Sequence, residues 1–465
     1  MRLTKGFWSY GIALAIVGGV IAVIVRVNRD RLPSGSTGVR PTTLAALGTL
    51  GAADTSRDGL RQIVETARMR LRQRPTDADA AMVLADALMR QARVTGNAGL
   101  ARGAEQALVR VLRDEPLDYG ARRMLATVYL SEHRFRDAIR EAERLRDERP
   151  RDDWNYGVIG DGHLELGEYD AAFAAFQRMI DLRPTAGAYA RAAYALELRG
   201  RLDAALEAMR LSTDATAPND PESIAWHHAQ MGDLHRNMGR LKDAAFEYAW
   251  ADHSFPGHPF ARIGMARIKE ADGDLRGAAA AYEQLMSTAP TPDVAEKLGD
   301  LYTALDRPID AARQYALAEA GWRDDAPQPA LLARFLAEHG RSLDEAVRLA
   351  EGAAADRHDI VTEDALAWCY FKAGRLTDAA AAVEKARRTG THDRSILFHA
   401  AAIAQALGDA DGGRQLARLA LEGNPRFDTR LAPAARRLLE PPVNVHRGGR
   451  PEHKPLGEST ASLLH

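Results

Sequence analysis

The sequence predicts an all-α protein built as a superhelical solenoid of antiparallel helix pairs. Three observations support this prediction: a helix–turn–helix pattern at 153–184, its recurrence at a nearly fixed interval, and a composition rich in alanine, with only 6% aromatic residues. Closely packed helices need small residues at their contacts, so this composition suits them. The formal net charge of −2 argues against nucleic acid as a partner.

The stretch at 153–184 contains two amphipathic helices separated by Gly167. Apolar and small residues recur three and four positions apart, which is the spacing of one helix face. In the first helix they are Tyr156, Ile159, Gly160 and His163, and in the second Ala172, Phe176 and Met179. Gly167 and Pro184 end the two helices, because neither residue continues a helix well.

The glycine between the two helices recurs along the chain, at Gly167, Gly200, Gly239, Gly273, Gly340, Gly374 and Gly408. The intervals are 33, 39, 34, 67, 34 and 34 residues, and the interval of 67 is two units with Asp306 in place of the middle glycine. Such a period is typical of repeat architectures, in which each helix pair buries its apolar face against its neighbours. We expect about nine to ten units between residues 77 and 426.

This pattern resembles the tetratricopeptide repeat (TPR), a helix–turn–helix unit of 34 residues. The resemblance rests on the recurring glycine, on a small residue where the helices cross, such as Ala172, and on an aromatic residue that packs into the next unit. It implies a right-handed superhelix with an open concave groove, a protein or peptide partner, and neither catalysis nor a cofactor. Family members that bind chaperone peptides clamp a carboxylate with Lys and Asn. Here those positions hold Gly157, Ala190 and Ala229, so that ligand is not implied.

The amino terminus predicts a membrane anchor. Residues 7–25 include no charged residue and would span about 28 Å as a helix, close to the thickness of the hydrocarbon core. Trp8 and Tyr10 fit an interfacial aromatic belt, and a cleaved secretory signal is the alternative. The charge is about +3 before the span and +2 after it, which favours the amino terminus inside the cell. We therefore expect a single-pass protein of a bacterial inner membrane with its solenoid in the periplasm.

The sequence divides into four parts. Residues 1–31 form the anchor, 32–56 a flexible linker rich in Gly, Ser, Thr and Pro, 57–440 the solenoid with capping helices, and 441–465 a disordered tail. Nearly all of the ordered length belongs to repeats, and no catalytic motif is found, so we do not expect an enzyme.

Candidate partner-binding residues lie on the first helix of each unit, about one helical step from its packing stripe. Large aromatic residues there supply contact area at low entropic cost, and charged residues add specificity. Ordinary packing between repeats is the alternative for each of them. The candidates are Trp154, Asp161, Tyr194, Trp226, Asp233, Arg236, Phe260, Arg267 and Trp368.

One helical stripe resembles a metal site. It consists of His228, Met231, His235 and Met238 at i, i+3, i+7 and i+10, and thioether with imidazole suits copper. Packing between helices is the favoured interpretation, because Met231 and His235 match positions in the repeat register that face the neighbouring helix. We therefore expect no metal, and the single cysteine, Cys369, cannot form an internal disulfide.

Together these features favour a membrane-tethered TPR scaffold that binds a protein or peptide partner in its groove. Such a scaffold would help to assemble or regulate a bacterial cell-envelope complex. A cytoplasm-facing membrane adaptor is the first alternative, since the charges on the two sides of the anchor are nearly balanced. A metal or haem handling protein that uses the His and Met stripe is the second.

Overall fold

The structure, a computed structural model, describes residues 54–97, 99–324 and 328–440. The predicted anchor, the predicted tail and most of the predicted linker lie outside these ranges. Within them, none of the helices combines the length and the apolar character needed to cross a membrane.

The described residues form 22 helices and no strand. The twenty helices from α4 to α23 form ten consecutive antiparallel pairs. The first helices of the pairs are α4 (Ala78–Thr95), α6 (Tyr119–Ser131), α8 (Asp153–Glu165), α10 (Ala186–Leu198), α12 (Pro221–Asn237), α14 (Pro259–Asp272), α16 (Pro292–Ala304), α18 (Pro329–Glu338), α20 (Ile360–Lys372) and α22 (Arg394–Ala406). The second helices are α5 (Gly99–Asp114), α7 (Phe135–Glu148), α9 (Tyr169–Leu182), α11 (Leu202–Asp214), α13 (Leu241–Ser254), α15 (Leu275–Thr288), α17 (Pro308–Asp324), α19 (Leu343–Asp356), α21 (Leu376–Ala386) and α23 (Ala410–Leu421). Helices α3 (Arg57–Gln73) and α24 (Leu431–Arg437) flank them.

The turn inside each pair requires a left-handed backbone conformation. All seven glycines of the predicted period have positive φ, between 63° and 93°. Asp306 has φ of 57°, which confirms that it takes the place of a glycine. His133, 34 positions before Gly167, also adopts a positive φ of 58°. Glycine is preferred in such turns because a Cβ makes this conformation unfavourable.

Aromatic rings of the second helices fill the space left by glycines of the first helices. The fully buried ring of Tyr248 in α13 lies between Gly232 of α12 and Gly264 of α14. A Cβ at Gly232 or Gly264 would lie 2.5 Å or 2.2 Å from that ring. Phe176 occupies the same kind of space beside Gly160. This packing explains why the repeat combines small and aromatic residues at fixed positions.

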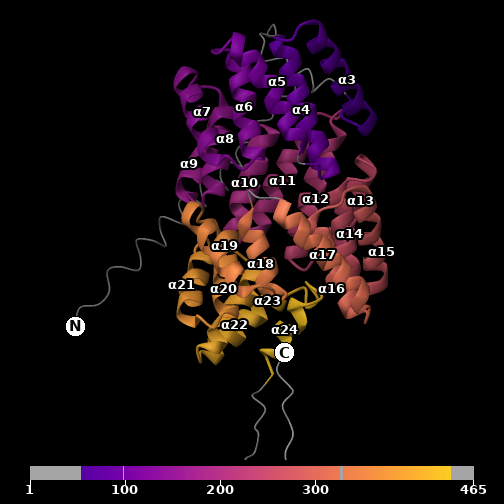
Figure 1. The fold of residues 1–465 in the computed structure, drawn as a ribbon, viewed down its shortest axis with the longest axis vertical. Helices are drawn as coiled ribbons and strands as arrows, with labels where there is room; N and C mark the ends of the chain where they lie inside the picture. Colours follow the sequence, from indigo (N-terminus) through magenta and orange to yellow (C-terminus); the bar gives the residue numbers. More distant parts are fainter. Residues whose placement is uncertain (1–53, 98, 325–327, 441–465) are drawn as a thin grey trace, which may run out of the picture.

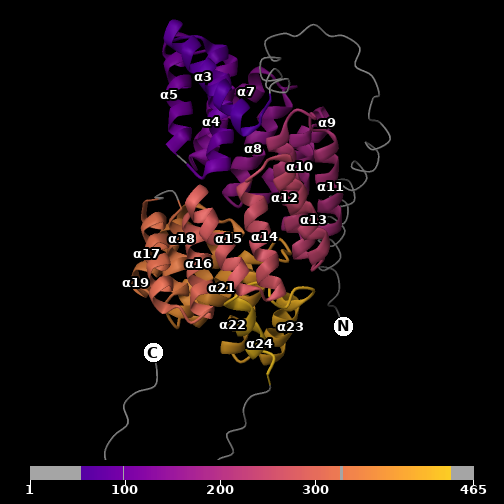
Figure 2. The same ribbon diagram turned by 90° about the vertical axis from the view of Figure 1, so that its right-hand side faces the viewer.

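The solenoid winds so far that its later units lie against its earlier ones. In Figure 1, α18–α21 lie directly below α9–α11, and Figure 2 shows α3–α5 and α22–α24 at opposite ends of the molecule. The backbone amide of His358 donates to the carbonyl of Leu166 at 3.0 Å. The backbone of the turns at Gly200 and Gly239 also lies close to the backbone of Gly390 and Gly423. We call this line of contacts the seam.

Arginines of the later units hold the seam together. Their guanidinium groups donate to carbonyls at the carboxyl ends of first helices in the earlier units, where carbonyls lack partners within the helix, or in the turn that follows such a helix. Arg388 donates to Gly167 O at 2.9 Å and Arg394 to Asn237 O at 2.8 Å. Arg426 donates to the carbonyls of Ala271 and Asp272. Positive charge at the carboxyl end of a helix is also favourable for the helix dipole.

Two further contacts join units far apart in the sequence. At the amino-terminal end, Arg93 of α4 makes a bidentate ion pair with the buried Glu222 of α12, with both distances 2.8 Å. At the carboxyl-terminal end, Asp428 pairs with Lys297 of α16. The inner face is therefore not the open groove that the sequence predicts, because the chain itself covers much of it.

Candidate functional site

A cavity of about 760 Å³ lies along the seam. One wall is formed by the carboxyl ends of α8, α10 and α12 together with the turn before α7. The other wall is formed by the amino-terminal turns of α18, α20 and α22 and by the end of α19. Its volume is within the range of small-ligand sites, about 300 to 1,000 Å³.

The cavity has an apolar body. Val361 of α20 keeps 47% of its surface exposed although it is a β-branched apolar residue, because it faces the cavity. The other apolar lining residues include Leu164, Leu198, Leu202, Leu331 and Ile396. Side chains from five separate units thus form a wall that an apolar group could contact.

Three carboxylates line the earlier wall; that of Asp137 is paired with Arg134, and the other two are those of Glu165 and Glu197. Glu165 is the last residue of α8, and Arg357 from the α19–α20 turn donates to its Oε2 at 3.0 Å. Glu197 lies in the last turn of α10, and its Oε1 accepts a hydrogen bond of 3.1 Å from the Asn237 amide. Burial raises the pKa of Glu165 to about 7, although Arg357 acts in the opposite direction.

The pKa of Glu197 is raised in the same way. Burial, together with the nearby negative charge of Asp233, raises it to about 7. The Asn237 amide and Arg236 act in the opposite direction without compensating. A carboxyl group with such a pKa changes its charge near neutral pH.

Two carboxylates on the opposite wall, those of Asp359 and Asp393, are used within the chain as helix caps. Asp359 accepts hydrogen bonds from the amides of Val361 and Thr362 at the start of α20. Asp393 accepts in the same way from the amides of Ser395 and Ile396 at the start of α22. Aspartates at these positions cap helices and offset the positive end of the helix dipole.

Of the residues proposed from the sequence, Tyr194 lines the cavity. It lies on α10, one turn before Glu197, and 45% of its surface is exposed. Burial raises the pKa of its hydroxyl, and the nearby carboxylates of Glu165 and Glu197 raise it further. Tyr194 therefore places a neutral ring and hydroxyl beside two carboxylates.

The proposed charged residues bind within the chain. Arg191 of α10 makes three hydrogen bonds to the Asp161 carboxylate, at 2.6, 2.9 and 3.1 Å. Asp233 accepts from the hydroxyl of Tyr248 at 2.9 Å, and it also pairs with Arg236 and Arg267 at 3.2 and 3.4 Å. These contacts satisfy Asp161 and Asp233 and join neighbouring first helices.

The proposed tryptophans are packed to different extents. The Trp154 indole donates to the Thr127 hydroxyl at 3.2 Å and lies under the Arg123 guanidinium. Trp226 is half-buried against an apolar cluster formed by α9–α12. Phe260 at the start of α14 is 37% exposed but does not line the cavity.

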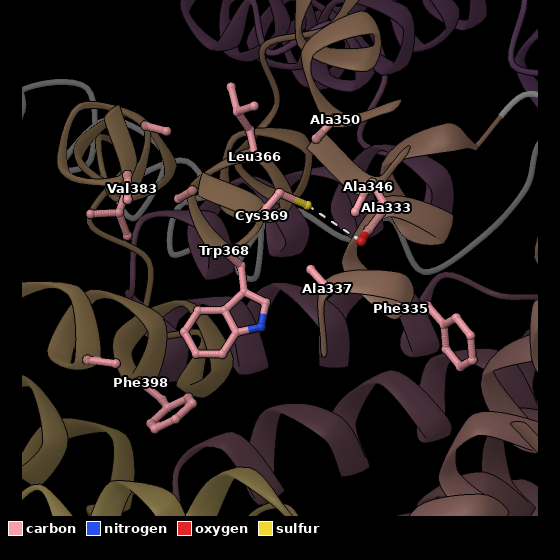
Figure 3. Packing of buried hydrophobic residues seen from close by; sticks show 14 of the residues in the cluster. Ala333, Phe335, Ala337, Ala346, Ala350, Leu366, Trp368, Cys369, Val383 and Phe398 are labelled. Atoms are coloured by element: carbon pink, nitrogen blue, oxygen red, sulfur yellow. Dashed lines mark hydrogen bonds between the residues drawn. The ribbon is translucent and has the colours of Figure 1, made fainter. Parts of the chain in front are cut away.

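Trp368 is removed from the candidates by its position in the core. It is only 6% exposed, and its indole stacks on His399 with 4.1 Å between ring centroids. Figure 3 shows its ring close to Phe398, while the neighbouring Cys369 thiol points to the carbonyl of Ala333. Core residues therefore cover the side of Trp368 that the sequence analysis predicted to face a partner.

The histidines and methionines of the proposed metal stripe have other contacts. His228 Nδ1 lies 2.7 Å from Glu247, and its ring stacks on Trp250. Met231 and His235 are buried, and Met238 packs against the same α9–α12 cluster as Trp226. Across the described part of the chain, no group of three or more His, Cys, Asp or Glu side chains is placed to hold a metal ion.

Glu165 and Glu197 were not identified from the sequence, although a signal for them exists. Each lies two or three residues before a turn glycine, at the negative end of a helix, where acidic residues are unfavourable. A residue type that is unfavourable for the helix end on which it lies indicates a role other than helix stability.

The family comparison tests the repeat itself. Residues 158–221, which include α10 and α11, match the family model of the tetratricopeptide repeat. This stretch of the chain carries tetratricopeptide repeats. A search of curated proteins found no match to this chain.

Several solved structures are similar to this chain. A thermophilic TPR protein from Thermus thermophilus, TTC0263, is 20% identical, with a TM-score of 0.33 over 37% of this chain and 91% of that one. PilW, a widely conserved type IV pilus biogenesis factor, is 19% identical, with a TM-score of 0.38 over 44% and 94%. The human IFIT1 dimer with PPP-AAAA is 14% identical, with a TM-score of 0.44 over 68% and 72%.

Proposed function

We propose that this TPR protein is a scaffold that binds a partner protein by holding one of its peptide segments in the seam cavity. Arrays of this type are suited to protein interaction. The observation that carries the proposal is the exposed ring of Tyr194 opposite the exposed side chain of Val361, both inside the cavity. Exposed aromatic and aliphatic side chains in a concave site are typical anchors for a bound peptide.

The proposal includes the cellular context expected from the sequence. The predicted span at 7–25 would tether the repeats to a bacterial inner membrane, with the solenoid in the periplasm. The scaffold would then help to assemble or regulate a complex of the cell envelope. No catalytic step is assigned to the chain.

Site-specific photocrosslinking tests the binding site. We would replace Tyr194 with p-benzoylphenylalanine in the full-length chain and irradiate living cells. Leu117, which is 81% exposed on the α5–α6 connection, provides the matched control position. We expect a defined crosslinked protein from position 194 and none from position 117. If both positions give the same bands, or position 194 gives none, the cavity does not bind a partner.

A second crosslinking position tests another surface. Phe246 and Trp250 are exposed on one face of α13 and do not line the cavity. A partner that crosslinks at Phe246 but not at Tyr194 would place binding on that face instead.

Topology is tested separately, because each compartment contains different partners. Alkaline phosphatase, or a fluorescent protein that matures only in the cytoplasm, would be fused after Glu440. Phosphatase activity without fluorescence is the expected result for a periplasmic solenoid. Fluorescence without phosphatase activity would make the cytoplasm-facing adaptor the better hypothesis.

A further inference from the structure

We propose that the seam cavity recognises a positively charged side chain of the partner peptide, an arginine or lysine flanked by apolar residues, with Glu197 as its principal anion. This inference rests on the proposed function and specifies the chemistry of its ligand. It is opposite in charge to the carboxylate clamp of the chaperone-binding TPR proteins. The argument depends on the seam arginines, on the ion pairs of the cavity and on its apolar wall.

The seam arginines follow a series that is interrupted at α10. The first helices α8, α12 and α14 each receive an arginine side chain at their last carbonyls, from Arg357, Arg394 and Arg426. Among the described residues, no arginine side chain donates to the last carbonyls of α10, which lies between α8 and α12 in the same row; only backbone amides of the following turn do so. The carboxyl end of α10 therefore faces the cavity without the cation that its neighbours have.

Glu197 adds a negative charge at this position. Its carboxylate accepts a hydrogen bond from the neutral Asn237 amide, and it forms no ion pair with any residue in the described ranges. Glu165 shares one cation, Arg357, with Asp359. A helix end and a glutamate together attract a cation more strongly than either does alone.

The groups that face Glu197 from other helices do not neutralise it. Asp233 and Arg236 lie on α12, and Asp393 lies at the start of α22. The two aspartates outnumber the single arginine, and Arg236 is itself paired with Asp233. The local charge around Glu197 is therefore negative.

The remaining walls suit the rest of a basic side chain and its neighbours. Tyr194 and Glu197 lie three residues apart on α10, and both line the cavity. A guanidinium group bound at Glu197 can therefore stack on the ring of Tyr194. Val361, Leu331 and Ile396 line the opposite side, where they can contact apolar residues of the peptide. An arginine or lysine has a charged end and an aliphatic stem, which matches this arrangement.

Two peptides that differ only in charge test this inference. The probe is acetyl-Leu-Arg-Leu-amide, and its twin has citrulline, a neutral isostere, in place of arginine. Binding to the purified full chain would be measured by titration calorimetry at pH 8, where Glu197 is ionised. We expect the arginine peptide to bind at least about tenfold more tightly, and Glu197→Gln to reduce this ratio to less than about threefold. Glu65→Gln, an exposed glutamate on α3, should leave the ratio unchanged.

Each other outcome overturns the inference. Equal binding of the two peptides, no binding of either, or an unchanged ratio in Glu197→Gln would show that charge is not recognised at this site. Tighter binding of n-butylguanidine than of the arginine peptide would identify a free small cation as the ligand instead of a peptide. The melting temperature is the control for folding. If that of Glu197→Gln is unchanged or higher, a loss of binding is not caused by a loss of folding.

Crosslinking separates this inference from the proposed function. The partner captured at Tyr194 would be compared in the wild-type chain and in Glu197→Gln. A strong decrease in the variant is expected. An equal yield would contradict recognition of a basic side chain but keep the proposed function, whereas no capture in either chain would contradict the proposed function itself.

Discussion

Replacement of Glu197 by glutamine should stabilise the protein at alkaline pH. The folded-state pKa of about 7 lies above the ordinary value of 4.5, so the folded chain holds a proton that the unfolded chain has released between these two pH values. Stability consequently falls as pH rises through this window, and the loss is complete above pH 7. Glutamine removes the charge and keeps an oxygen for the Asn237 amide.

The magnitude follows from the size of the shift. A difference of about 2.5 pKa units corresponds to about 3.4 kcal/mol, and solvent in the cavity reduces this to about 1 to 2 kcal/mol. Linkage predicts that roughly a quarter of the effect is present at pH 5. Urea unfolding of both chains at pH 8 and pH 5, followed by far-UV circular dichroism, would measure it. Glu65→Gln on α3 is the matched control, since this glutamate is exposed.

Two results would refute the reasoning about Glu197. If the variant is less stable than the wild type at pH 8, the carboxylate contributes favourable contacts that the structure does not contain. If the stability difference is the same at both pH values, the pKa of Glu197 is not raised by folding. The expected result would mean that the chain gives up stability at the cavity, as binding sites commonly do.

The seam and the core give two further predictions. Gly374→Ala and Gly239→Ala both place a side chain at φ of 77° or 76°, which should reduce the free energy of unfolding by about 1 to 2 kcal/mol. At Gly239 the new Cβ would also lie 2.5 Å from the Cα of Gly423, whereas Gly374 has nothing within 4 Å, so urea unfolding should show a further loss of about 1 to 3 kcal/mol for Gly239→Ala alone. Equal losses would mean that the seam does not form. Burial raises the pKa of the Cys369 thiol to about 12, and its Sγ donates to Ala333 O. A disulfide reagent at pH 8 should therefore label Cys369 only in denaturant. Rapid labelling of the native chain would contradict the buried position.

The helix pairs and their turns could be predicted from the sequence because they depend on local chemistry. The spacing of the turn glycines was sufficient to place Asp306 where the other units have a glycine, and its positive φ in the structure confirms this position. The residues that a TPR array buries between neighbouring helices repeat with the same period, so the sequence contains them directly.

The cavity and the seam could not be predicted in this way. They depend on the superhelical pitch, which is the sum of small rotations over many repeats, and no short segment encodes that sum. The direction of a charged side chain on the inner face is also not encoded locally. Asp161 and Asp233 were assigned to a partner, but Arg191 and Tyr248 of neighbouring helices bind them. Trp368 was placed in the groove, and it lies in the core.

The seam also restricts how this array could change in length during evolution. An open solenoid can gain or lose a unit, because each unit contacts only its neighbours. Here the turns at Gly167, Gly200 and Gly239 lie against 358, 390 and 423, so the two rows advance together in steps of similar length. Deletion of one pair between them would bring the wrong turns into contact and move every arginine of the seam away from its carbonyl. The number of units between the two rows is therefore fixed by geometry, and a homologue that differs in length should differ at its ends.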